Sequence, residues 1–394
     1  MKTEKVLLGD IAEFIRGINF KPDDVVAVGT PESVVCMRTK NVQAEIYLSD
    51  IWAVNKSFVK REKQLLQVGD ILVSSANSWN LVGKCCWIPE LPWKASFGGF
   101  VTVLRPHKEK VNQNFLYRWF ASDRVQALLR SFGQKTTNIS NLNIDRCLKL
   151  ELYLPPIAEQ KRIAEILDRT QSLISKRKEA IAKLDTLTQS IFLEMFGNPV
   201  TNPKGLVIKK FKDIGTLDRG VSKHRPRNAP ELLGGIYPLI QTGDVANCGG
   251  YIRQYQSTYS EIGLRQSKMW RSGTLCITIA ANIAKTGILT FDACFPDSVV
   301  GFLSEDLATI EFVRVWLSFL QKTLEETAPE SAQKNINLAI LRDLNVPFPP
   351  LPLQKEFTQR VEAVEKLKAT HRASLSQLQS LFASLQHRAF RGEL

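Results

Sequence analysis

The chain repeats itself, and this duplication constrains its fold more than any other feature. In the first part of each half the matches share one offset of 203 residues (10 to 213): Asp10-Ile11 with Asp213-Ile214, and Arg16-Gly17 with Arg219-Gly220. Further along the offset becomes 194 (141 to 335): Asn141-Leu142-Asn143 with Asn335-Ile336-Asn337, and Pro155-Pro156 with Pro349-Pro350. Chance matches do not keep one register over such spans, so the chain is a tandem duplication.

Each half has the same plan: a strand-rich segment, then Pro-Pro, then a long helix. Two prolines suit a helix start, where the N–H that proline lacks has no partner anyway, and Gly197 suits a helix end. The first helix is predicted at about Ile157–Phe196, roughly 60 Å long at ~1.5 Å per residue, and the second at about Leu351–Phe390. The predicted division is a globular domain at 1–153, a helix at 154–197, a linker at 198–205, a second domain at 206–347 and a second helix at 348–394.

Apolar residues recur along both helices in alternating steps of four and three, which is typical of a coiled-coil seam. The predicted seam comprises Ile163, Leu167, Ile174, Ile181, Leu184, Ile191, Phe357, Val361, Val364, Leu375, Leu378 and Leu385. Packing the two helices on each other would bury both stripes, although each helix could instead pack on its own domain. Polar residues interrupt the seam at Arg177, Lys368 and His371, and these could fix the register or be solvated positions.

The expected fold class is α+β, with two α/β domains related by pseudo-twofold symmetry and separated by an antiparallel coiled coil of two long helices. Within the domains, residues 68–88 and 272–292 are predicted β-hairpins, because an apolar strand follows a Gly turn in each. Asn114–Arg130 and Glu311–Glu326 are predicted amphipathic helices.

Charge and cysteine content bound the function. The net charge is +13 and the pI about 9.4, which favours a polyanionic partner. The 7 cysteines form no CxxC pair, so a metal finger or disulfide framework is not expected, and a reducing cytoplasm fits best. No stretch is apolar enough to suggest a signal peptide or a membrane span.

Catalytic motifs are missing from the sequence. It has no phosphate-binding loop, no GxGxxG after a strand, no FxGxG or [DNS]PP[YFW] methyltransferase motif, no HExxH and no Ser/His/Asp pattern. Glu159-Gln160-Lys161 could be forced into a nuclease motif, but a solvated helical turn explains it better, since Leu353 replaces the Glu in the second half. The chain is therefore expected to be non-catalytic by itself and to need neither metal nor cofactor.

Candidate DNA-binding residues lie in polar and basic loops, because phosphates attract cations and base edges need forked donors and acceptors. In the first half they are Asn77, Ser78, Trp79, Asn80, Lys84, Thr136, Thr137 and Asn138. In the second half they are Arg219, Lys223, Arg225, Arg227, Asn282, Lys285, Gln333 and Lys334. Ordinary solvated loops would look similar. Asn141 and Asn143 are expected to cap backbone, and Tyr251 could be an exposed stacking platform or simply pack.

These matched features resemble a known family. Leu154–Leu167 with the following long helix, which ends at Phe196-Gly197-Asn198-Pro199, resembles the first conserved region of type I restriction-modification specificity (S) subunits. Residues 348–357 and the terminal 386–394 resemble the second region, and 136–143 and 332–338 also look like segments of that family. The resemblance covers the whole chain in order, with Leu353 as a minor departure.

The resemblance implies two target-recognition domains that read an asymmetric, two-part site on double-stranded DNA. The helices would dock two methyltransferase subunits, which would recruit restriction/translocase subunits. S-adenosylmethionine, Mg²⁺ and ATP would belong to those partners. The alternatives that remain are a specificity subunit of a related type II system, a DNA-modifying enzyme with an unfamiliar site, and a protein scaffold whose charge is incidental.

Overall fold

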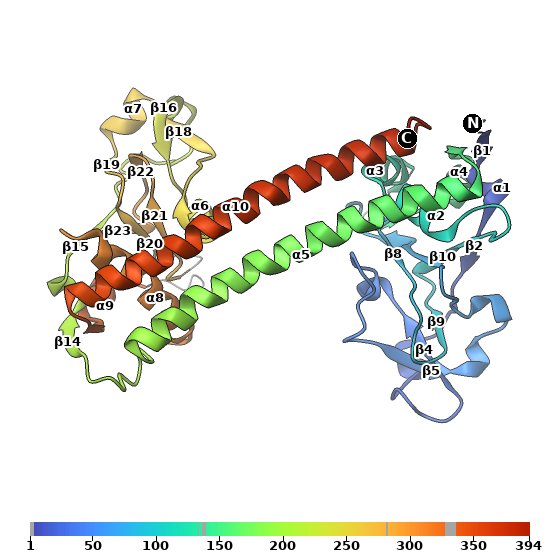
Figure 1. The fold of residues 1–394 in the computed structure, drawn as a ribbon, viewed down its shortest axis with the longest axis horizontal. Helices are drawn as coiled ribbons and strands as arrows, with labels where there is room; N and C mark the ends of the chain where they lie inside the picture. The colour runs from blue at the N-terminus through green and yellow to red at the C-terminus, as the bar shows by residue number, and fades with distance from the viewer. Residues whose placement is uncertain (1–3, 133, 136–138, 281–282, 328–335) are drawn as a thin grey trace. The chain divides into compact units, whose positions relative to one another are not determined.

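The structure is a computed structural model, and it describes the chain except residues 1–3, 133, 136–138, 281–282 and 328–335. The chain divides into two compact units: unit 1 is Met1–Arg177 with Ser374–Leu394, and unit 2 is Lys178–Ala373. Each unit contains one globular domain and a part of each long helix, α5 (Ile157–Phe196) and α10 (Leu351–Ala389) (Figure 1). Both long helices follow the sequence prediction closely.

Unit 1 is built from small sheets and short helices. Its sheets have the strand orders β2-β10-β6-β8, β3-β5-β4-β9, β11-β12-β7 and β1-β13. The strands are β1 (Glu4–Leu7), β2 (Ala12–Arg16), β3 (Val25–Val26), β4 (Ser33–Met37), β5 (Trp52–Asn55), β6 (Ile71–Ser74), β7 (Ala76–Asn77), β8 (Cys85–Trp87), β9 (Ala95–Phe97), β10 (Val101–Pro106), β11 (Gln134–Lys135), β12 (Ser140–Asn141) and β13 (Glu151–Leu154). The short α-helices are α1 (Leu8–Ile11), α2 (Gln113–Phe120), α3 (Asp123–Ser131) and α4 (Ile144–Leu148), with 3-10 turns at Pro22–Asp24, Thr39–Asn41, Lys56–Phe58 and Glu62–Gln64.

Unit 2 has the sheets β15-β23-β20-β21-β17, β18-β16-β22-β19 and β14-β24. The strands are β14 (Val207–Lys210), β15 (Thr216–Arg219), β16 (Leu233–Leu239), β17 (Gly250–Ile252), β18 (Ser257–Tyr259), β19 (Met269–Trp270), β20 (Leu275–Thr278), β21 (Thr286–Leu289), β22 (Ala293–Cys294), β23 (Val299–Leu303) and β24 (Asn345–Phe348). The shorter α-helices are α6 (Thr242–Asn247), α7 (Glu261–Arg265), α8 (Leu307–Thr327) and α9 (Leu338–Asp343), with 3-10 turns at Phe211–Asp213 and Pro230–Leu232.

The duplication read from the sequence is present in the topology. The antiparallel order β2-β10-β6-β8 of unit 1 corresponds to β15-β23-β20-β21 of unit 2, and β1-β13 corresponds to β14-β24. Both predicted hairpins are confirmed: Ile71 pairs with Trp87 in β6 and β8, and Leu275 pairs with Ile288 in β20 and β21. The two hairpins therefore take up the same strand positions in their sheets.

The helix predicted at Asn114–Arg130 is wrong as a single helix, because it is divided into α2 and α3. Ser122 has extended backbone angles, and its hydroxyl donates to the Trp119 carbonyl at 2.6 Å. Ser122 is the residue that precedes α3, a boundary position that serine favours. Its counterpart in unit 2 is the continuous α8, which begins earlier than predicted, at Leu307, where Asp306 accepts the Ala308 N–H.

A buried glutamine anchors the start of each long helix. Gln160 accepts the Asn112 N–H at 2.7 Å and donates to the Pro155 carbonyl at 2.8 Å. Gln354 accepts the Thr309 hydroxyl at 2.8 Å and donates to the Pro349 carbonyl at 2.7 Å. Because a buried amide must satisfy its donors and acceptors, the same side chain serves both halves, and this explains the repeated Pro-Pro…Gln pattern.

In each unit the start of one long helix packs near the end of the other, so the pairing is antiparallel. In unit 1, Ile163 and Leu167 of α5 share a core with Ala389 and Phe390 at the end of α10. In unit 2 the ring of Phe357, near the start of α10, lies 5.7 Å from that of Phe192 and 5.3 Å from that of Phe196, at the end of α5. The helices thus pack on each other and also on the globular domains. The sequence had left these two arrangements as alternatives, and the structure has both.

The twelve seam residues are all at least partly buried. The buried members are Ile163, Leu167, Ile174, Leu184, Phe357, Val361 and Val364. The half-buried members are Ile181, Ile191, Leu375, Leu378 and Leu385. Burial is deepest where the helices also touch a globular domain, because there a third element covers the seam.

Candidate nucleic-acid interface

The hairpin loop of unit 1 holds four of the predicted DNA-contacting residues. Ser78, Trp79 and Asn80 are exposed. Asn77 is half-buried: its amide donates to the Ser74 hydroxyl at 3.0 Å, and its carbonyl oxygen accepts the Ser78 N–H at 2.8 Å. Asn77 therefore holds the loop in shape, and its exposed neighbours are better placed to reach a base edge.

Two exposed apolar residues, Ile139 and Phe100, come from segments whose backbone pairs beside this loop, and the sequence reasoning missed both. Strand β7 pairs with β12, which places Asn77 opposite Ser140 and next to the exposed Ile139. The carbonyl of Phe100 accepts the N–H groups of Ser75 and Ala76, and the Phe100 side chain is 65% exposed. With Trp79 this gives two exposed aromatic rings from one region of unit 1. Only strand pairing could reveal it, because the contributing segments are far apart in sequence.

In the basic loop of unit 2, two of the positive charges are paired with an acidic residue from another part of the chain. Arg225 and Arg227 both form ion pairs with Asp297, and Arg225 also donates to the Ser222 and His224 carbonyls at 2.6 and 2.8 Å. Lys223 and Arg219 have exposed side chains. Because Asp297 offsets one of two positive charges, Lys223 and Arg219 are the stronger candidates for phosphate contacts.

The remaining candidates are more scattered. Lys84 is half-buried and donates to the side-chain Oε1 of Gln43 at 2.6 Å, and Lys285 is half-buried. Residues Thr136, Thr137, Asn138, Asn282, Gln333 and Lys334 lie outside the described residues. Asn143 caps α4 by accepting the Arg146 N–H at 3.0 Å, as the sequence predicted.

Tyr251 is not the exposed stacking platform that was considered. Its hydroxyl donates to the Glu311 carboxylate at 2.8 Å, and burial raises the pKa of the phenol. It lines a polar cavity of about 660 Å³ in unit 2, together with Gln241, Asn247, Arg253 and Arg372. Arg253 and Arg372 had not been singled out from the sequence.

The possible nuclease motif is a helical turn. Glu159 forms an ion pair with Arg162 one turn along α5, with Nε to Oε1 at 2.8 Å, and this contact lowers the pKa of the carboxyl group. Among the residues that the structure describes, no three His, Cys, Asp or Glu side chains gather closely enough to hold a metal ion.

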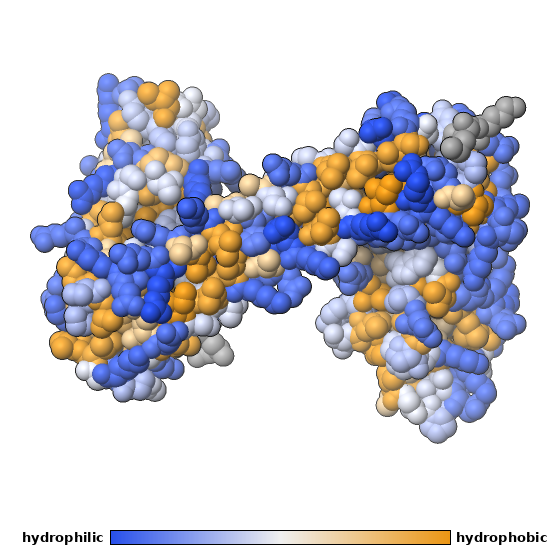
Figure 2. Space-filling model, viewed as in Figure 1, coloured by the Kyte–Doolittle hydropathy of each residue, from blue (hydrophilic) through white to orange (hydrophobic). Residues whose placement is uncertain are grey.

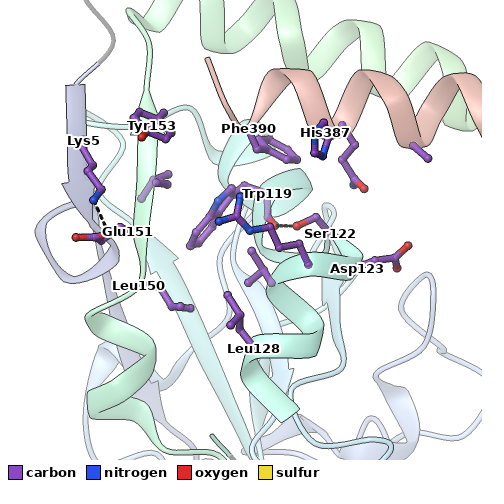
Figure 3. A pocket seen from close by; sticks show the side chains of 15 residues that line it. Lys5, Trp119, Ser122, Asp123, Leu128, Leu150, Glu151, Tyr153, His387 and Phe390 are labelled. Carbon is purple, nitrogen blue, oxygen red and sulfur yellow. Dashed lines mark hydrogen bonds and ion pairs between the residues drawn. The ribbon is translucent and has the colours of Figure 1, made fainter. Parts of the chain in front are cut away.

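A second cavity, of about 360 Å³, lies in unit 1 between α3, β13 and the end of α10 (Figure 3). Trp119, Leu128, Leu150 and Phe390 point toward it, and the ion pair between Lys5 and Glu151 (2.6 Å) lies at its edge. Charged and polar side chains, among them Asp123, Arg124 and His387, line the rest of the cavity, so its wall is mixed and carries no specific chemistry.

Exposed leucines recur on the long helices, and hydrophobic residues are visible along this part of the molecule in Figure 2. Unit 1 carries Leu173 on α5 and Leu381 on α10, and unit 2 carries Leu187 on α5 and Leu367 on α10. The offset of 194 relates Leu173 to Leu367 and Leu187 to Leu381, so the two pairs are equivalent positions of the duplication. We call these the leucine pairs. Their side chains are 43–50% exposed, and their recurrence at equivalent places in both units makes them candidates for a docking surface.

The cysteines are poor nucleophiles. All seven are free, and burial raises the pKa of the Cys36, Cys86 and Cys147 thiols to about 12. Cys248 is half-buried, and its pKa is also raised by burial. The thiolate is the reactive form, so none of these four has the lowered pKa of an activated cysteine.

We therefore expect a thiol reagent at pH 8 to modify Cys248 first and the buried thiols only on unfolding. A pKa of about 12 leaves a thiol roughly a thousandfold less ionised at pH 8 than one near 9, and burial also blocks access. Mass spectrometry of the modified protein would measure this, and Cys248→Ser should abolish the fast phase. Rapid native-state labelling of Cys36 would contradict the assignment.

No helix among the described residues is both long and apolar enough to cross a lipid bilayer.

Comparison with known proteins places these features in one family. The model described as the type I restriction modification DNA specificity domain matches the chain twice, at residues 2–184 and 203–380. These matches cover most of the chain and fall on its two repeats, each taking in a globular domain and most of the helix that follows.

Individual relatives agree with this match. The EcoKI specificity subunit of Escherichia coli K12 is 23% identical over 98% of this chain and 87% of its own length. The putative MjaX specificity subunit of Methanocaldococcus jannaschii is 23% identical over 84% of this chain and 80% of its own length.

Solved structures share the fold. The S subunit of a type I restriction-modification system from M. genitalium aligns with a TM-score of 0.60 at 13% identity, over 99% of this chain and 96% of that one. A chain from a study of complex assembly and conformational transition in the type I R-M system aligns at 0.59 and 16%, over 100% and 98%. The two family matches, on two repeats that share a four-strand sheet order, mean that the chain belongs to the type I restriction modification DNA specificity family.

Proposed function

We propose that the chain is the sequence-specificity subunit of a type I restriction-modification complex, and that it is not catalytic by itself. The observation that carries the proposal is the double match to the DNA specificity domain, one copy on each of two repeats that share a four-strand sheet order. Each repeat would read one half of a two-part DNA site. Since the loops of the two repeats differ in sequence, the half-sites would differ too, so the whole site would not be a palindrome.

The exposed residues are of the two kinds that bind DNA: cations bind phosphates, and polar or aromatic loop residues contact bases. In unit 1 the base-contacting candidates are Ser78, Trp79 and Asn80, with the exposed Phe100, whose carbonyl accepts the N–H groups of Ser75 and Ala76 just before them. In unit 2 the phosphate-contacting candidates are Arg219 and Lys223. The net charge of +13 supplies the attraction that such a protein needs for DNA.

The leucine pairs support docking of two copies of one partner, one copy on each unit. We assign that partner as the methyltransferase subunit, which would in turn bring the restriction/translocase subunits. S-adenosylmethionine, Mg²⁺ and ATP would bind to those partners and not to this chain.

The direct test is to sequence the methylated bases in a host that expresses this chain with its methyltransferase subunit. We expect one methylated motif made of two unlike blocks with a fixed gap. A continuous motif, a palindrome, or robust methylation by this chain alone would each overturn the proposal.

A finer prediction concerns the basic loop. Changing Lys223, Arg225 and Arg227 together to alanine should weaken DNA binding about equally for cognate and unrelated duplexes, because phosphate contacts carry no sequence information. Removing two to three phosphate contacts should reduce the salt dependence of log K by about 2–3. Fluorescence anisotropy across a salt series would measure both.

A matched pair of double variants compares the exposed cations near this loop with the two arginines that contact Asp297. Lys223→Ala with Arg219→Ala should lower affinity more than Arg225→Ala with Arg227→Ala, because Asp297 offsets part of the charge of the second pair. Equal decreases in affinity would show that the ion pairs with Asp297 do not persist on DNA.

A further inference from the structure

A lysine is buried in the seam between the two long helices of unit 2. Lys368 of α10 is 4% exposed. Its Nζ lies 2.8 Å from Oδ1 of Asp185 on α5 and 2.7 Å from Oε1 of Glu365 on its own helix. Charged residues are rarely buried unless they are paired, so this position is specified by its partners and not by packing alone.

The surrounding charges are also paired. Glu365 contacts Arg253 at 3.3 Å and Arg372 at 3.7 Å as well as Lys368. Asp185 is 58% exposed at its side chain, so its carboxylate is partly solvated even while paired. Of these ion pairs around Lys368, the one with Asp185 is the one that joins the two long helices.

The equivalent place in the first half has no charge. Applying the offset of 194, Lys368 corresponds to Ile174, Glu365 to Gln171, and Asp185 to Gln379. Ile174 is buried, as an apolar seam residue should be. The duplication has therefore diverged at this level of the seam: α5 carries the acid, and α10 carries the buried base.

We infer that Asp185 and Lys368 select the partner of each long helix, so that α5 pairs with α10 and not with the α5 of a second copy. Two similar helices with similar seams could pair with themselves. In an antiparallel α10–α10 pair, Lys368 would meet Gln379 of the other copy, and in an α5–α5 pair Asp185 would meet Ile174. Two α5–α10 pairs hold two Asp185–Lys368 ion pairs, whereas one α5–α5 pair and one α10–α10 pair hold none.

This role differs from stabilisation. A buried ion pair gains little over well-packed apolar residues, because desolvation offsets the attraction, whereas a single buried polar residue can fix the register and partner of a coiled coil. Lys368→Ile restores the residue of the first half, leaves Glu365 with two arginines, and leaves Asp185 in water. It should therefore fold normally and lose only the selectivity.

The test starts from the full chain, folded with a protease site inserted in the 198–205 linker and then nicked. Two batches of the nicked protein, one of them isotopically labelled, are mixed in mild urea so that their halves can exchange. Native mass spectrometry then separates unlike pairs, which hold one α5 half and one α10 half, from like pairs, which hold two copies of the same half. In the wild type, unlike pairs should dominate. The relevant equilibrium constant is that for converting two unlike pairs into one α5–α5 pair and one α10–α10 pair. Lys368→Ile should raise this constant, toward the value expected for random pairing, by roughly tenfold for each of the two ion pairs that it removes.

Lys366→Ile is the matched control, since Lys366 is an exposed lysine on the same helix and its replacement should leave the distribution unchanged. A second measurement decides the matter if the nicked halves do not exchange. In the intact chain, Asp185→Lys should lower hydrogen-exchange protection of α5 when Lys368 is present and should be neutral in the Lys368→Ile background. Additive effects, or unchanged pairing in the nicked Lys368→Ile protein, would overturn the inference. Neither readout involves DNA, so the result is independent of the proposed function.

Discussion

Replacing Phe192 by alanine is expected to cost unit 2 about 3–5 kcal/mol of unfolding free energy, the usual range for emptying a large aromatic site in a core. The Phe192 ring is buried on α5, and its centroid lies 5.0 Å from that of Phe196, 5.4 Å from Phe312, 5.0 Å from Phe319 and 5.7 Å from Phe357. These rings come from α5, α8 and α10. One truncation therefore loosens the packing of both long helices on the globular domain of unit 2.

The measurement should report on unit 2 alone, because a chain with two compact units does not guarantee a single two-state transition. Hydrogen exchange followed by mass spectrometry gives that resolution, and we expect decreased protection in α8 and in the adjacent segments of α5 and α10. The neighbouring Leu193 is exposed, so Leu193→Ala should change stability by less than about 0.5 kcal/mol. Equal destabilisation by the two variants would contradict the role assigned to the aromatic cluster.

Charging one leucine pair is expected to remove one copy of the methyltransferase subunit from the complex. Leu173→Glu with Leu381→Glu changes unit 1, and Leu187→Glu with Leu367→Glu changes unit 2. Burial of each leucine in an interface contributes about 1.5–3 kcal/mol, and a carboxylate there would also have to be desolvated, so affinity at the altered unit should fall at least about a hundredfold. Native mass spectrometry of the complex should show two bound copies becoming one.

These variants should leave folding intact, because the leucines are exposed in the isolated chain. Lys176→Glu on α5 is the control for charge alone, and it should retain both copies. Changing both leucine pairs should remove both copies. Retention of two copies in the quadruple variant would place the docking surface elsewhere.

The sequence by itself determined the architecture, because the relevant signals are local or periodic. The repeated register revealed two domains, the steps of three and four revealed the seam, and Pro155-Pro156 and Gly197 marked the ends of α5. Hairpins were predictable as well, because β6–β8 and β20–β21 pair across short stretches of chain. The division of Asn114–Arg130 into α2 and α3 was missed, because the helical pattern of apolar residues continues through the break at Ser122.

The tertiary structure decided which side chains remain available to a partner. Arg225 and Arg227 look like open cations in sequence, but Asp297, some 70 residues away, pairs with both. Phe100 and Ile139 join the Trp79 loop only because β7 pairs with β12 and the Phe100 carbonyl receives two N–H groups. Lys368 is an ordinary break in a heptad pattern until Asp185 is placed beside it. Long-range interactions of this kind depend on how distant segments are brought together, and that information is not contained in the spacing of residues along one stretch of chain.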